Sequence, residues 1–143
     1  MNENSLRCLE EINKNKICLI GGLGLVGLYV DILDSLEHVY GIIPQKYHLI
    51  TSPEKHRDFQ DQDLDLDFVN NTIHEYDYQT VLRENYTAIY EICTELIEEE
   101  RNHFDIVCEL TGGTKPVSIA LTILSQKYNL PRIYYSGERI IEI

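Results

Sequence analysis

Short apolar runs alternate with amphipathic segments along most of the chain. Residues 17–20 are continuously apolar and are followed by Gly21 and Gly22, a pattern typical of a strand that is buried on both faces. Between Leu25 and Tyr40, apolar residues recur every three or four positions, which predicts a helix packed on a sheet. Alternation of such strands and helices predicts a parallel sheet covered by helices.

The same alternation continues beyond residue 40. Further strands are expected at 47–51, 71–76 and 104–110. Ser52 suits the N-cap of a helix, because its side-chain oxygen can accept a hydrogen bond from a free backbone N–H group. Pro53 suits the first helical position, because it has no backbone N–H group that needs an acceptor. Residues 56–68 alternate Asp and Leu without a clear period, and we interpret them as a solvated acidic face.

A long helix is expected after Asp77, which is a suitable N-cap, and should close in the charged run 98–101. Its predicted buried face carries Leu82, Tyr86, Ile89, Cys93 and Leu96. A last helix follows Pro116 and is expected to carry Val117, Ala120, Leu121 and Leu124 toward the sheet. Residues 132–136 and 139–143 flank Gly137-Glu138, which predicts a type II′ antiparallel hairpin.

Together these elements predict one α/β domain over residues 1–143. We expect a Rossmann-like, mostly parallel sheet with helices on both faces and a C-terminal antiparallel hairpin. The 143 residues include 24 Asp and Glu against 12 Lys and Arg, a formal net charge of −12. This charge argues against a broad surface for long nucleic acid or an anionic membrane, so a nucleotide ligand would need a local positive site.

The four cysteines, at positions 8, 18, 93 and 108, form no C-x-x-C pair. We expect reduced, mostly buried thiols, with no metal site and no cofactor. The polar N-terminus does not resemble a signal peptide, and the uncharged run 17–30 is too short to span a bilayer. A cytoplasmic location is therefore predicted.

Two glycine-rich turns follow predicted strands. The first, Gly22-Leu23-Gly24-Leu25-Val26-Gly27, matches the G-x-G-x-x-G pattern of dinucleotide sites. Such sites usually carry an acidic residue at the end of the second strand, where this chain has Thr51 and Ser52. A turn without a ligand, a phosphate-facing turn and an NAD or FAD site all stay open.

The second turn is Thr111-Gly112-Gly113-Thr114-Lys115, between the strand at 104–110 and the last helix. Its backbone N–H groups, two hydroxyls and one ammonium group suit an anionic ligand. It is not a P-loop, because Lys115 follows Thr and precedes Pro116. A helix start capped by Thr is the alternative without a ligand.

The run from Glu109 to Ser118, ELTGGTKPVS, resembles the CRISPR-associated Rossmann fold (CARF) family. The resemblance implies a homodimer that binds cyclic oligoadenylate, cyclic tetra-adenylate in the first place, across its two-fold axis in type III CRISPR antiviral signalling. It also implies a fused or separate effector. The implied ligand-binding residues are Gly22, Leu23, Gly24, Thr51, Ser52, Lys55, Thr111, Gly112, Gly113, Thr114 and Lys115.

Some members of that family cleave the ring, so this chain is either a pure sensor domain of a longer effector or a metal-independent ring nuclease. In the nuclease, a ribose 2′-OH would attack its own 3′-phosphate and leave 2′,3′-cyclic phosphate ends. Lys115 would stabilise charge, and Thr114 or Thr111 would orient the reacting groups. No general base is evident, because His48, His56 and His74 are scattered. A small NAD(P)-binding protein is the third hypothesis.

Overall fold

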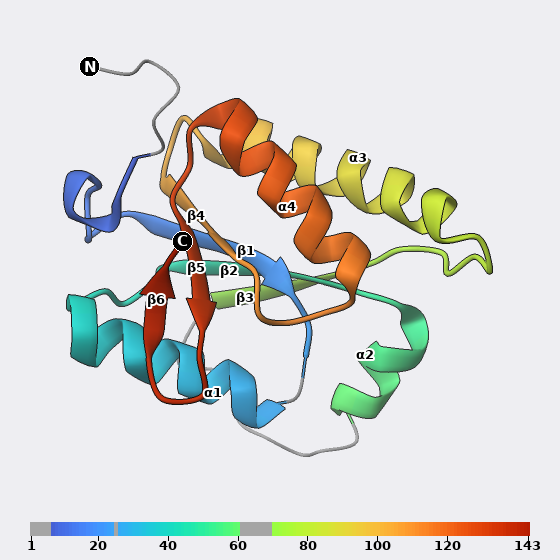
Figure 1. Cartoon of the computed structure of the whole chain (residues 1–143), viewed down its shortest axis with the longest axis horizontal. Coiled ribbons are helices and arrows are strands. Elements are labelled where there is room, and N and C mark those ends of the chain that lie inside the picture. Colours follow the sequence, from blue (N-terminus) through green and yellow to red (C-terminus); the bar gives the residue numbers. More distant parts are fainter. Residues whose placement is uncertain (1–6, 25, 61–69) are drawn as a thin grey trace.

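The computed structural model describes residues 7–24, 26–60 and 70–143 (Figure 1). Its sheet has the strand order β3-β2-β1-β4-β5-β6. The strands are β1 (Ile17–Gly22), β2 (Lys46–Thr51), β3 (Asn70–Glu75), β4 (Asp105–Glu109), β5 (Arg132–Tyr135) and β6 (Ile140–Glu142). Neighbouring strands from β3 to β5 are parallel, and β6 pairs antiparallel with β5. The predicted Rossmann-like α/β fold with a C-terminal hairpin is confirmed.

Helices cover both faces of the sheet. They are α1 (Val26–Ser35), continued by the π-helical turn η2 (Leu36–Tyr40), α2 (Pro53–Gln60), α3 (Leu82–Glu100) and α4 (Lys115–Tyr128), with a short 3-10 turn η1 (Leu9–Glu11) before β1. Figure 1 shows α1 on one face and α3 with α4 on the other. Among the helices of the described ranges, none combines the length and apolarity needed to span a bilayer.

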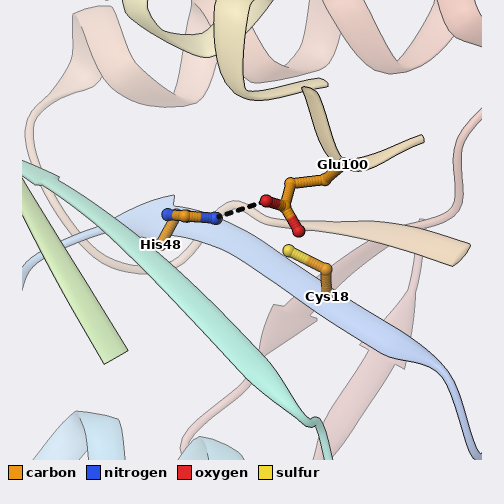
Figure 2. Close-up of side chains that lie close together, drawn as sticks. All are labelled: Cys18, His48 and Glu100. Carbon is orange, nitrogen blue, oxygen red and sulfur yellow. Dashed lines mark ion pairs between the residues drawn. The ribbon is translucent and has the colours of Figure 1, made fainter. Parts of the chain in front are cut away.

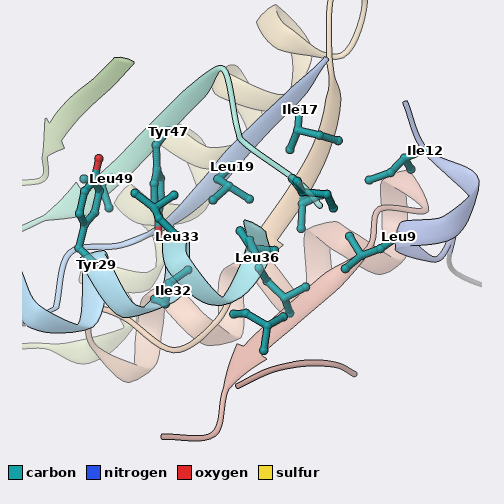
Figure 3. Close-up of a cluster of buried hydrophobic side chains, with 14 of the residues drawn as sticks. Leu9, Ile12, Ile17, Leu19, Tyr29, Ile32, Leu33, Leu36, Tyr47 and Leu49 are labelled. Atoms are coloured by element: carbon teal, nitrogen blue, oxygen red, sulfur yellow. The ribbon is translucent and has the colours of Figure 1, made fainter. Parts of the chain in front are cut away.

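Each face of the sheet has its own buried cluster, because alternate strand residues point to opposite sides. On the α1 face, Leu19 and Tyr47 pack against Ile32 and Leu36, and the Tyr29 and Tyr47 rings stack at 5.2 Å (Figure 3). On the other face, Cys18, Ile20, Ile106 and Cys108 pack against Ile89, Cys93, Val117, Ala120, Leu121 and Leu124. Both faces of the central strand β1 are therefore covered, as its continuous apolar run predicts.

The cysteines are free, as expected, and three of them are buried. Burial raises the pKa of Cys18 and of Cys93 to about 12. In the absence of a metal ion these thiols are therefore protonated near neutral pH, which agrees with their placement in the core.

Several predicted boundaries hold and one is wrong. Ser52 Oγ accepts the Lys55 N–H at 3.4 Å, and α2 begins at Pro53, as predicted. The expected cap at Asp77 is wrong: α3 begins at Leu82, and Leu82 is 67% exposed. Asn85 instead holds the preceding turn, because its side-chain oxygen accepts the Gln79 N–H at 2.7 Å and its amide donates to the Gln79 carbonyl at 2.8 Å.

Only the first part of the acidic segment 56–68 lies within the residues that the structure describes. Its first five residues belong to α2, whereas 61–68 lie outside the described residues, as does Leu25. At the other end of the chain, the hairpin turn has Gly137 at φ 101°, the positive φ that a type II′ turn requires at its first central position. The Ser136 N–H donates to the Arg139 carbonyl at 3.0 Å and closes this turn.

Candidate functional site

The carboxyl ends of β1, β2 and β4 border one cavity of about 380 Å³. This is the edge of an open α/β sheet where ligands usually bind. The cavity is lined by Leu23, Gly24, Ile50, Thr51, Lys55, Asp58, Tyr76, Gly113, Thr114 and Val117. The turn after β1, the start of α2 and the turn after β4 therefore meet at one place.

Six of the residues expected to bind ligand line this cavity: Leu23, Gly24, Thr51, Lys55, Gly113 and Thr114. The other five do not line it: Gly22, Ser52, Thr111, Gly112 and Lys115. Lys115 is exposed at the first position of α4, directly after the cavity residue Thr114. The two glycine turns thus share a site, although their residues differ in what they can contribute to it.

Gly22, Gly112 and Gly113 allow the two turns to pack against each other. A Cβ on Gly22 would lie 2.5 Å from the Gly112 carbonyl oxygen and 2.6 Å from Gly113 Cα. Gly113 has φ 79°, which favours glycine as well. We predicted these glycines for close approach of a ligand, but for Gly22 and Gly112 the structure shows close approach of one backbone to another.

Beneath the second turn lies a buried carboxylate that the sequence analysis did not single out. Glu109, at the end of β4, is 0% exposed. Its Oε1 accepts the Thr111 N–H at 2.6 Å, and its Oε2 accepts the Gly112 N–H at 3.2 Å. Burial raises the pKa of Glu109, while hydrogen bonds from Thr111, Gly112 and the Tyr47 hydroxyl act in the opposite direction.

These bonds engage the backbone N–H groups of Thr111 and Gly112, two residues that the family resemblance assigns to ligand binding. Both N–H groups donate hydrogen bonds to the Glu109 carboxylate, so neither is free to donate to a phosphate. The Thr111 hydroxyl bonds to Glu109 and accepts the Tyr135 N–H at 2.7 Å. Thr111 therefore ties β4 to β5 instead of facing the cavity.

The backbone N–H groups of this turn that remain free lie at its C-terminal end, where α4 begins. Within the described chain, no acceptor is found for the N–H groups of Gly113, Thr114 or Lys115. Such N–H groups at a helix start favour an anion. In the first turn, the Leu23 N–H donates to the Ile50 carbonyl at 2.9 Å. We expected this N–H to face a ligand, but it is already bonded within the fold.

The cavity also has an apolar floor that the sequence analysis missed. Ile50, Tyr76 and Val117 are buried and line it, beside the expected hydroxyls and the Lys55 side chain. Asp58 places an acidic group at the same cavity. The three histidines considered as bases, His48, His56 and His74, do not line it. Tyr76 follows β3 and Val117 lies in α4, so neither residue belongs to the two glycine turns on which the sequence analysis concentrated.

The model of the Card1 CARF domain matches residues 38–140 of the chain. No curated protein sequence matches it significantly. Among solved structures, Can2 from Sulfobacillus thermosulfidooxidans in complex with cyclic tetra-adenylate is similar to 89% of this chain, with 21% identity and a TM-score of 0.59. Enterococcus italicus Csm6, bound to cyclic hexa-2'-fluoro-hexa-dAMP, is similar to 85% of it, with 16% identity and a TM-score of 0.62.

A third similar structure is VC1899 from Vibrio cholerae, with 10% identity over 89% of this chain and a TM-score of 0.61. The matched region is 34% of the Can2 chain, 33% of VC1899 and 34% of Csm6, so this chain spans about a third of each. At these identities the solved structures show a shared fold. The match of the family model, over well more than half of the residues, shows more: the chain belongs to the Card1 CARF domain family.

Proposed function

We propose that this chain is a sensor domain that binds cyclic oligoadenylate in type III CRISPR antiviral signalling. Within this class of ligand, we propose cyclic tetra-adenylate. The observation that carries this proposal is the cavity that the turns after β1, β2 and β4 form together. The family assignment supports it, as do Can2 and Csm6, similar folds that were solved with cyclic oligonucleotides.

The chemistry of the cavity suits a nucleotide. The buried side chains of Ile50, Tyr76 and Val117 offer an apolar surface for a base. Lys55 and the N–H groups at the start of α4 supply positive charge and donors for phosphate. A local site of this kind is what the net charge of −12 permits, since a small anion does not need a basic surface.

The ligand would be shared by two copies of the chain. A cyclic tetra-adenylate has two-fold symmetry, and a symmetric dimer presents each donor group twice around one axis. The outer face of α4 offers a suitable contact, because Ile119 and Ile123 lie one turn apart and are 52% and 44% exposed. Since α4 begins at the cavity, pairing through it would bring the two cavities together.

Ligand binding is tested by thermal unfolding. Cyclic tetra-adenylate is expected to raise the melting temperature of the chain, because a ligand that binds only the folded state stabilises it, and NAD is expected to leave it unchanged. Lys55→Ala and Lys115→Ala should each weaken binding by about 1.5–3 kcal/mol, the range for a hydrogen bond to a charged group. Lys14→Ala is the matched control, because Lys14 is exposed and does not line the cavity. A shift with NAD alone would refute the proposal.

The dimer is tested by replacing the exposed isoleucines of α4. Ile119→Asp should give a monomer in analytical ultracentrifugation and weaken binding of cyclic tetra-adenylate at least about tenfold, because it places a charge in an apolar contact. Leu82→Asp is the control, since Leu82 is equally apolar and 67% exposed but lies on α3. If both variants sediment as the unaltered chain does, α4 is not the interface.

Pure sensing is better supported than ring cleavage. The Thr111 hydroxyl is engaged by Glu109 and Tyr135, and the three histidines named above do not line the cavity. Thr114 and Lys115 are exposed and remain the candidate groups for a nuclease. Incubation of the ring with excess protein in EDTA, followed by chromatography, decides the matter: we expect the ring to stay intact.

The NAD(P) hypothesis has little support from the geometry. β2 ends at Thr51, without the acidic residue that usually binds the ribose. Gly22 is packed against Gly112 and Gly113, and the Leu23 N–H is bonded to Ile50. The first glycine turn is thus used mainly for packing.

A further inference from the structure

A second group of functional side chains lies on the α3 face of the sheet. Cys18 of β1, His48 of β2 and Glu100, the last residue of α3, point toward one another (Figure 2). The Cys18 sulfur, the His48 ring nitrogen and a Glu100 carboxylate oxygen all lie within 4.8 Å of one another. The three residues are 0%, 5% and 7% exposed, so the cluster is enclosed by protein.

Two polar atoms of this cluster have no hydrogen-bond partner among the residues that the structure describes. They are His48 Nε2 and Glu100 Oε2. His48 Nε2 lies 3.7 Å from Glu100 Oε1, which is too long for a hydrogen bond. Buried polar atoms are nearly always satisfied, so two unsatisfied atoms within one enclosed cluster point to an additional partner such as a cation.

The neighbours of the cluster orient these atoms for a cation. His48 Nδ1 lies 2.8 Å from His74 Nε2, and a donor role for Nδ1 in that hydrogen bond leaves the lone pair of His48 on Nε2. Lys46 Nζ lies 2.9 Å from Glu100 Oε1 and occupies that oxygen. Glu100 Oε2 therefore remains available as a ligand atom.

We propose that Cys18 Sγ, His48 Nε2 and Glu100 Oε2 bind a zinc ion. Sulfur, imidazole nitrogen and carboxylate oxygen are the three ligand types that zinc accepts in proteins, and their mixture fits its intermediate softness. The Cys18 thiol proton passes to solvent on coordination, and the two resulting negative ligands balance the charge of the ion. A water molecule completes the tetrahedral coordination.

The location of the cluster supports both a route for the ion and a role for it. A groove of about 420 Å³ between β3 and α3 is lined by His74 and by the carboxylates of Glu75, Glu95 and Glu99. His74 lines the groove and contacts His48 directly, so the acidic groove lies next to the cluster. Zinc would connect β1 and β2 to the C-terminal end of α3, where the helix dipole favours a cation. None of the three ligand residues lines the nucleotide cavity, so this proposal does not depend on the proposed function.

The test is a titration of the full chain with Co²⁺, a spectroscopic substitute for zinc, after metal removal and under reducing conditions. We expect one Co²⁺ per chain, a thiolate-to-cobalt charge-transfer band in the near ultraviolet, and displacement of the band by Zn²⁺. Cys18→Ser should abolish the band, and His48→Gln and Glu100→Gln should each weaken affinity at least about tenfold. His74→Gln should weaken it about 10- to 100-fold, as loss of an orienting partner does.

Cys93→Ser is the matched control, because Cys93 is a buried cysteine of the same face that lies outside the cluster, and it should keep the band. Circular dichroism of each variant without metal establishes that it is folded. If Cys18→Ser does not fold, the His48 and Glu100 variants decide the question. Absence of the band, or a band and an affinity that survive in these variants, would overturn the proposal and leave the cluster as the Lys46–Glu100 ion pair.

Discussion

Glu109→Gln is expected to lower the free energy of unfolding by about 1–3 kcal/mol, the cost of leaving a buried polar group unsatisfied. Both carboxylate oxygens of Glu109 accept backbone N–H groups, from Thr111 and from Gly112. In the variant, the new NH₂ group must face one of these donors, so one hydrogen bond is replaced by a contact between two donors. Glu109→Ala should cost more, about 3–5 kcal/mol, because it also leaves a cavity.

Urea unfolding followed by circular dichroism measures both effects. The control is Glu91→Gln, the same chemical change at an exposed position of α3, which should fall within about 0.5 kcal/mol of the unaltered chain. Because the Glu109 network holds the turn that leads to Thr114, Glu109→Gln should also weaken binding of cyclic tetra-adenylate. Equal stability of the Glu109 and Glu91 variants would show that the network contributes nothing to the fold.

Gly22→Ala is expected to destabilise the chain by about 1–3 kcal/mol, the usual effect of adding a methyl group to filled space. The new Cβ would meet the Gly112 carbonyl and Gly113 Cα at 2.5 and 2.6 Å. These are backbone atoms, so the two turns must separate. Gly113 lines the cavity, and binding of cyclic tetra-adenylate should therefore fall together with stability.

The matched control is Gly24→Ala, one position beyond Leu23 in the same turn. Its Cβ would meet the flexible Leu28 side chain at 3.2 Å and Gly112 Cα at 3.4 Å, so the change in stability should be within about 0.5 kcal/mol. Thermal and urea unfolding of the two variants can be compared directly. If Gly24→Ala is the more destabilising of the two, the packing of one turn on the other is not what requires Gly22.

Most of the fold follows from local pattern. The apolar run at 17–20 predicts a strand covered on both faces, and the three- and four-residue spacing of Val117, Ala120, Leu121 and Leu124 predicts the buried face of α4. The start of α3 could not be predicted in the same way. Asp77 is a good N-cap by residue type, but the turn before the helix is held by Asn85, whose side chain reaches back to Gln79.

The candidate site divides along similar lines. The strand pattern places the two glycine turns at one edge of the sheet, because parallel strands end there, and the family resemblance adds the end of β2. The structure brings residues of all three segments to one cavity. The sequence pattern does not predict Tyr76 or Val117 as cavity residues, and the resemblance assigns Thr111 and Gly112 to a ligand. A sequence motif does not show whether its backbone N–H groups are free, because an acceptor elsewhere in the fold can bind them. Here that acceptor is the Glu109 carboxylate.

By itself, then, the sequence determined which strands and helices follow one another along the chain. It also determined that the sheet is covered on both faces and that the glycine turns lie at the carboxyl edge of the strands. Only the tertiary structure decided which groups lie together: Glu109 beneath the turn that follows it, and Cys18 beside His48 and Glu100. The physical reason is the distance along the sequence over which each kind of interaction acts. Periodicity and capping act between residues a few positions apart, whereas Cys18 and Glu100 become neighbours through the crossover connections of a parallel sheet, which no local spacing records.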